Sequence, residues 1–222
     1  MIMNIKLTAT MAALLVAGGM STFGQGYVLF VTEKNGVYDN FSGASQVAAG
    51  DVTSTFLWAP TGTADPLGAG SSSTATSAAG AWATIASMLS SGWSVAVNAA
   101  TSNEVDVADN ASGAFKGQSA YNGGVAFGLA GNYTPGASLE MVVIGWDNLT
   151  GAGTLEQAED PQPVGWSGAF TYATGATSGS TVSTFGNSGE APFGVASVPE
   201  PASLALAGLG GLSMLFLRRR KS

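Results

Sequence analysis

The sequence contains no cysteine and no histidine among its 222 residues. Without cysteine there can be no disulfide, thiol nucleophile or thiolate metal site. Without histidine, the usual base of a serine triad is missing. A Ser–Lys dyad built on Lys34 or Lys116 is the remaining arrangement, but neither lysine lies in a recognisable motif. We therefore expect no catalytic residues in this chain.

Charge is scarce as well. Charged residues make up 9% of the chain, whereas a typical soluble protein has about 25%. Between about residues 25 and 198, Lys34 and Lys116 are the only cations among thirteen acidic residues, which gives this part a formal charge of −11. A surface of this kind repels phosphate, so we expect no nucleic acid among the partners.

Glycine and apolar residues are abundant, with 32 glycines and 45% hydrophobic residues. This composition suits short strands joined by turns, and it does not suit a helical bundle with charged outer faces. We predict a mainly β fold: one antiparallel β-sandwich or jelly-roll-like domain with a short helix. Periodicity predicts the helix at 81–90 and strands at 27–32, 52–59, 93–99, 113–116, 124–130, 139–147, 165–173 and 181–186.

For some of these segments the sequence also predicts where they lie in the fold and how ordered they are. The nearly continuous apolar run at 139–147 predicts a central strand. Alternation places Trp166, Phe170 and Tyr172 on one face of a single strand. The stretches 62–80 and 174–189 are rich in Gly, Ser and Thr, so we expect a long loop and a weakly structured approach to the C-terminus.

The N-terminus has the pattern of an export signal. One cation, Lys6, precedes an apolar run from Leu7 to Met20, and small residues follow at Thr22 and Gly24. We expect residues 1–24 to be a helical signal peptide that a signal peptidase removes. The alternative is a buried N-terminal helix.

The C-terminus combines three features in a fixed order. Pro199-Glu200-Pro201 is followed by an apolar run at 202–217, which would form about 24 Å of transmembrane helix. A basic tail then follows, made of Arg218, Arg219, Arg220 and Lys221. Cations at this end predict that it stays in the cytoplasm while the preceding chain lies outside.

This order resembles the PEP-CTERM sorting signal of exported bacterial proteins over residues 199–222. The resemblance implies recognition by an exosortase, with Pro199, Glu200 and Pro201 as the sorting motif and Arg218, Arg219, Arg220 and Lys221 as the membrane stop signal. It also implies transient anchoring in the inner membrane, followed by release to the cell envelope, surface or exterior. A single-span anchor that is never cut is the alternative.

Two inner segments, 25–30 and 135–147, are similar to parts of PEP-CTERM proteins from Verrucomicrobia-like bacteria. That likeness bears on fold and location and assigns no activity. The resulting domain plan is a signal peptide at 1–24, a β-sandwich-like exported domain at 25–190, a linker at 191–198 and the sorting signal at 199–222.

Acidic clusters offer two further kinds of site. Glu104, Asp106, Asp109 and Asn110 could supply oxygen ligands to calcium, although their spacing is not that of an EF-hand loop. Carboxylate pairs could also serve a glycosidase, either in this cluster or at Glu156, Glu159 and Asp160. Acids in turn-like sequence usually face water, so we expect no cofactor unless calcium binds at the first of these clusters.

The sequence thus favours an exported surface or extracellular-matrix protein with a structural or interaction role and no catalysis. The alternative is a carbohydrate-binding module that acts on extracellular polysaccharide. That function requires a row of aromatic side chains exposed on a strand, or an aromatic side chain beside an acid-rich loop. The five tryptophans are the candidates, although tryptophan at alternating strand positions is more often part of a core: Trp58, Trp82, Trp93, Trp146 and Trp166.

Overall fold

The computed structural model describes residues 26–34, 36–38, 52–66, 78–108, 110, 113–114, 116–147, 153–158 and 163–195. In this part of the chain strands predominate, most of them paired antiparallel, and they are accompanied by one α-helix and two short 3₁₀ turns. The prediction of a mainly β fold with one short helix is confirmed. The strand pairing does not confirm a sandwich or a jelly roll.

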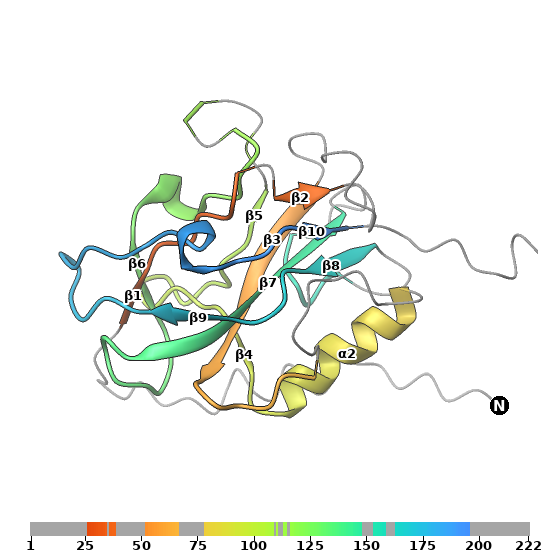
Figure 1. The fold of residues 1–222 in the computed structure, drawn as a ribbon, viewed down its shortest axis with the longest axis horizontal. Helices are drawn as coiled ribbons and strands as arrows, with labels where there is room; N and C mark the ends of the chain where they lie inside the picture. The colour runs from red at the N-terminus through yellow and green to blue at the C-terminus, as the bar shows by residue number, and fades with distance from the viewer. Residues whose placement is uncertain are drawn as a thin grey trace, which may run out of the picture.

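Two long antiparallel strands form the centre of the fold (Figure 1). They are β3 (Val52–Pro60) and β7 (Ser138–Asp147), which pair from Val52 opposite Asp147 to Pro60 opposite Leu139. Four short strands complete this sheet. Two pair with β3, namely β4 (Ser94–Val95) and β5 (Val107–Ala108), and two pair with β7, namely β8 (Val164–Trp166) and β9 (Phe170–Ala173).

The central sheet is buried on both faces because successive side chains of a strand point to opposite sides. In β7, Met141 and Val143 enter one hydrophobic cluster, whereas Val142 and Ile144 enter the other. The prediction of a central strand at 139–147 is therefore confirmed, with both clusters built around the same two strands.

One face of the sheet is covered by α2 (Ala78–Ser90). Ile85 and Met88 are buried in the cluster on this face, and Trp82 packs against it from a half-buried position. These residues are at helical spacing, so the sequence pattern identified the contact face correctly. The helix begins three residues before the predicted start at Ala81.

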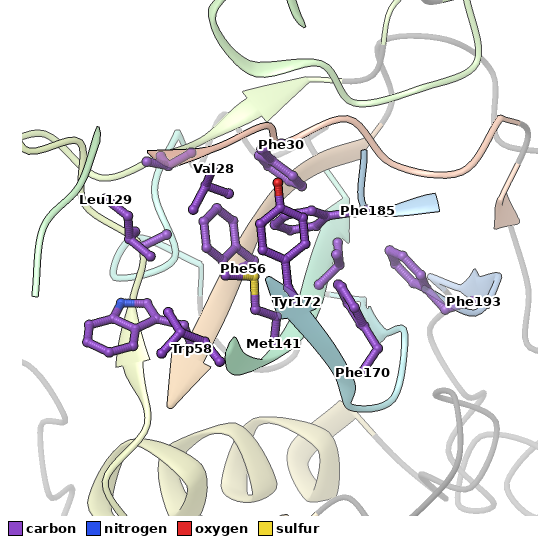
Figure 2. Close-up of a cluster of buried hydrophobic side chains, with 14 of the residues drawn as sticks. Val28, Phe30, Phe56, Trp58, Leu129, Met141, Phe170, Tyr172, Phe185 and Phe193 are labelled. Carbon is purple, nitrogen blue, oxygen red and sulfur yellow. The ribbon is translucent and has the colours of Figure 1, made fainter. Parts of the chain in front are cut away.

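The opposite face carries a larger, aromatic-rich cluster (Figure 2). A second small sheet contributes to it: β1 (Gly26–Val28) pairs antiparallel with β6 (Phe127–Leu129), just after the 3₁₀ turn η1 (Tyr121–Gly124). The C-terminal part of the described chain contributes the rest. It contains the 3₁₀ turn η3 (Gly186–Ser188) and β10 (Phe193–Gly194), which pairs in parallel with β2 (Val37–Tyr38).

The single strand predicted at 165–173 is wrong. Residues 167–169 separate β8 from β9, and Gly168 has a φ of +73°. The hydroxyl of Ser167 accepts a hydrogen bond from the amide of Val143 (3.0 Å) in place of a backbone carbonyl. Because of this interruption, Trp166 points into the helix-side cluster, whereas Phe170 and Tyr172 point into the aromatic one.

Other predicted strands are shorter than expected or missing. The strands predicted at 27–32, 93–99 and 124–130 are reduced to β1, β4 and β6. At 181–186 there is no strand but an isolated bridge at Thr184 that leads into η3, and near 113–116 there is a single bridge between Asn110 and Lys116. β2, β5 and β10 were not predicted because two residues are too few to show a period.

Candidate functional sites

Residues 184–195 form a continuous segment, here called the strap, that lies along the first described residues of the chain. The amide of Phe185 donates to the carbonyl of Val31 (3.0 Å), and the amide of Phe193 donates to the carbonyl of Gly36 (2.8 Å). Between these two bonds, the carboxylate of Glu190 accepts from the amide of Glu33 (3.0 Å). The strap is therefore held by its backbone at both ends and by one side chain in the middle.

Phe185 anchors the strap in the aromatic cluster. Its ring lies 4.9–5.3 Å, centroid to centroid, from the rings of Phe56, Phe170, Tyr172 and Phe30, mostly edge to face. Figure 2 shows Phe185 among these side chains, with Phe193 farther along the same segment. The expectation that 174–189 is weakly structured is wrong, because this stretch supplies a central residue of the core.

Phe193 and β10 pack against two glycines that are paired with each other on neighbouring strands of the central sheet. Gly145 of β7 is paired with Gly165 of β8. A Cβ atom on Gly145 would lie 2.9 Å from the Phe193 ring, and one on Gly165 would collide with the Gly194 carbonyl. The strap thus continues to Val195, which is buried, and β10 lies within the stretch 191–198 that the sequence predicts as a linker.

Glu190 is the most deeply buried carboxyl group described. It is 6% exposed. Burial raises the pKa of Glu190 to about 8, against the lowering effect of the Glu33 amide, and the nearby Glu33 carboxylate raises it further. Glu190 is therefore mostly protonated at neutral pH. The sequence pattern does not single out this residue, although Glu190 is the only charged residue between Asp160 and Glu200.

The second group of interest is a carboxyl pair on the chain between β4 and β5. Burial, and then the charge of Glu104, raise the pKa of Asp106 to about 9, and the hydrogen bond to Glu104 raises it too. Burial also raises the pKa of Glu104, whose Oε1 accepts from the amide of Leu155 (2.8 Å). Of the two groups, Asp106 is therefore the one that keeps its proton at neutral pH, and it donates this proton to the Glu104 carboxyl group.

The predicted calcium ligands are brought together only in part. Glu104 and Asp106 share a hydrogen bond, whereas Asn110 directs its side-chain amide to the Gln118 carbonyl (2.8 Å). Asp109 lies outside the described residues. Within the described ranges, no group of three acidic side chains could hold a metal ion. Calcium binding therefore stays a prediction.

The geometry gives little support to a glycosidase site at either acidic cluster. Glu104 and Asp106 are hydrogen-bonded to each other, and burial raises the pKa of both. In the other cluster, Glu156 is exposed, while Glu159 and Asp160 lie outside the described residues.

The tryptophans lie mainly in the two clusters. Trp58, Trp93, Trp146 and Trp166 are buried, and Trp82 is half-buried against the sheet. Four of the five candidates for stacking on a sugar are therefore core residues, as tryptophan at alternating strand positions usually is. In the described part of the chain, Val125 is the one large hydrophobic residue that is exposed.

The predicted sorting residues, Pro199 to Pro201 and Arg218 to Lys221, lie outside the described residues, as do the predicted signal and transmembrane helices. In the portion that is described, no helix has the length and hydropathy to cross a bilayer. For the C-terminus, support comes from a comparison of sequences. Residues 197–221 match the family model of the PEP-CTERM protein-sorting motif.

The chain carries a PEP-CTERM sorting motif. This motif indicates an extracellular protein that is sorted and processed by an exosortase, as predicted from the Pro-Glu-Pro sequence with its apolar run and basic tail. The match does not extend to the inner segments 25–30 and 135–147. Neither the curated proteins nor the solved structures contain a significant match to the chain.

Proposed function

We propose that this chain is a non-catalytic protein of the bacterial surface or extracellular matrix, delivered there by exosortase processing. The single observation that carries the proposal is the sorting motif at residues 197–221. The motif begins two residues after Val195, the last buried residue of the described domain. The folded part and the sorting part of the chain are therefore nearly adjacent in sequence.

Each end of the chain has a defined role in this proposal. A signal peptidase removes residues 1–24, and the apolar run at 202–217 holds the chain briefly in the inner membrane. Arg218, Arg219, Arg220 and Lys221 stop its passage, since cations are retained on the cytoplasmic side. The exosortase then recognises Pro199, Glu200 and Pro201, and the domain is released to the envelope or beyond.

The domain itself has a structural or interaction role in this proposal, without a chemical step. Its support is the placement of the aromatic and acidic side chains. The buried tryptophans fill cores, and Glu104 and Asp106 are engaged with each other. In this proposal the released domain lies in extracellular polysaccharide. A carbohydrate-binding module would need an exposed aromatic face, and no described observation favours it.

The test is to express three forms in a bacterium that has an exosortase and to follow them by fractionation. The wild type is expected in the surface or medium fraction. A variant with Pro199→Ala, Glu200→Gln and Pro201→Ala keeps the apolar run and the basic tail, so it should accumulate uncut in the membrane. Deletion of Pro199 to Ser222 removes the membrane stage, so this form should never appear in the membrane fraction.

The triple variant also separates processing from simple anchoring. A single-span anchor that is never cut would leave the wild type and the triple variant together in the membrane. The same location for all three forms would refute the proposed sorting.

A further inference from the structure

The strap joins two features that the function above does not use: a buried carboxyl group and the approach to the sorting motif. It is bound to residues 31–36 through three contacts, and Glu190 provides the one that involves a side chain. Around this contact the packing is close, because a Cβ atom on Gly186 would lie 2.9 Å from the Cα of Glu33.

Among the residues that the structure describes, no cation balances a charge on Glu190. Among the described groups, the ionisable neighbour that acts on it is Glu33, whose negative charge opposes a second one. Lys34 is in the same turn but is exposed. Tyr172, whose hydroxyl donates to the Ser183 carbonyl beside the strap (2.7 Å), has a pKa raised to about 12 and stays neutral. An ionised Glu190 would thus face a carboxylate in a buried site.

We propose that the strap is a proton-controlled latch, closed while Glu190 is neutral and released when Glu190 ionises and moves into water. Release detaches residues 184–195 from the turn at 31–36 and withdraws Phe185 and Phe193 from the aromatic cluster. The released strap is therefore a minor state, which ionisation of Glu190 populates further, and it lengthens the stretch of chain between the rest of the domain and the sorting motif.

The gain in reach follows from chain length. Pro199 is four positions after Val195, and these four steps of the chain span at most about 14 Å when fully extended. Pro199 is fifteen positions after Thr184, and these fifteen steps span at most about 54 Å. With the strap closed, a membrane-embedded processing enzyme that binds the sorting motif works close to the folded domain. With the strap released, the motif can lie much farther from the domain.

The direction of the pH dependence follows from the two states of Glu190. Its pKa is about 8 in the closed strap, and in a released, solvated strap it returns to the ordinary value near 4.5. The closed strap therefore binds a proton that the released strap gives up. The closing equilibrium weakens about tenfold for each pH unit between these two values and becomes constant above about pH 8.

Residue-resolved hydrogen exchange of the full chain in detergent micelles tests the latch from about pH 5 to about pH 9. The probes are the amides of Glu33 and Phe193, each corrected for its intrinsic exchange rate, with the Val143 amide of the central sheet as an internal reference. We expect the protection of both probes to fall about tenfold per pH unit relative to Val143, and then to level off above about pH 8.

Glu190→Gln keeps a hydrogen-bond acceptor for the Glu33 amide and cannot ionise. In this variant the relative protection should not change with pH, whereas the control Glu140→Gln, which removes a carboxylate outside the strap, should behave as the wild type. The latch is overturned by a wild-type protection that does not change with pH, or by the same fall in Glu190→Gln.

A second variant decides the matter if Glu190→Gln does not fold. Glu33→Gln removes the neighbouring charge and lowers the pKa of Glu190, so the fall in protection should level off at a lower pH than in the wild type. An unchanged levelling-off pH would contradict the latch. These measurements do not involve processing, so their failure is distinct from a failure of the sorting proposal.

Discussion

Asp106 and Glu104 show how burial without a cation changes the chemistry of a carboxyl group. Two ionised carboxylates in contact repel each other, and burial penalises each charge, so the pKa of both groups is raised. Glu104 keeps its charge more readily because the Leu155 amide and the Asp106 hydroxyl both donate to it. Asp106 is the protonated member, and its pKa is raised to about 9.

Replacing Asp106 with asparagine should therefore stabilise the protein at alkaline pH. The pKa of Asp106 rises from 3.8 on folding, so its contribution to stability is complete below that value and is lost as the pH rises to about 9. The side-chain amide of the introduced asparagine would donate to Glu104 without titrating. We expect the free energy of unfolding of Asp106→Asn to exceed that of the wild type by about 1–3 kcal/mol at pH 8, after allowance for partial solvent screening.

Urea unfolding at about pH 4 and at pH 8 measures this difference, with Glu140→Gln as the control. The two proteins should be nearly equal at the acidic pH, where Asp106 is protonated in the folded chain and only about half ionised in the unfolded chain. An Asp106→Asn variant that is less stable than the wild type at pH 8 would mean that Asp106 is ionised in the folded protein and makes a favourable contact.

At the scale of the elements, the sequence predicted what has a period and missed what does not. β3, β7 and α2 are long enough for alternation or helical spacing to show, and all three lie where the pattern placed them. The strap has no period. Its position depends on contacts with residues more than 140 positions away, such as Phe185 with Val31, which no local pattern encodes.

The same difference explains the candidate sites. Glu104, Asp106 and Asn110 are close in sequence, so the pattern groups them. Whether their side chains converge depends on Leu155 and Gln118, which lie outside this short stretch. Glu190 was missed because a lone acid in a Gly- and Ser-rich stretch usually faces water. Its burial follows from the packing of Phe185 and Phe193 on either side of it.

The glycine pair under β10 gives an element-scale prediction. Gly165→Ala places a methyl group against the Gly194 backbone, which cannot move away while Phe193 remains bonded to Gly36. We expect a loss of about 2–4 kcal/mol in the free energy of unfolding, at the upper end of the usual cost of overpacking. Thermal or urea unfolding measures it.

Gly179→Ala is the matched control, since no atom lies within 4 Å of its added Cβ. Its effect should stay within about 0.5 kcal/mol, or be slightly stabilising through the unfolded chain. Equal stability of the two alanine variants would show that β10 is not packed on Gly165.

At the scale of the whole molecule, the first and the last described segments of the domain are in contact with each other. Residues 26–38 and the strap lie side by side, so the segment that follows the expected export signal meets the segment that precedes the sorting motif. Figure 1 shows β2 and β10 together near one end of β3 and β7. The aromatic cluster requires Phe185, so it is complete only when nearly all of the described chain is present.

The fate of the C-terminus after export decides whether the sorting proposal holds. The decisive measurement is the intact mass of the exported protein recovered from a bacterium with an exosortase. We predict a mature chain that ends at or near Pro199 to Pro201 and lacks the tail from Arg218 to Ser222. A mass that still includes Ser222 in the surface or medium fraction would contradict exosortase processing.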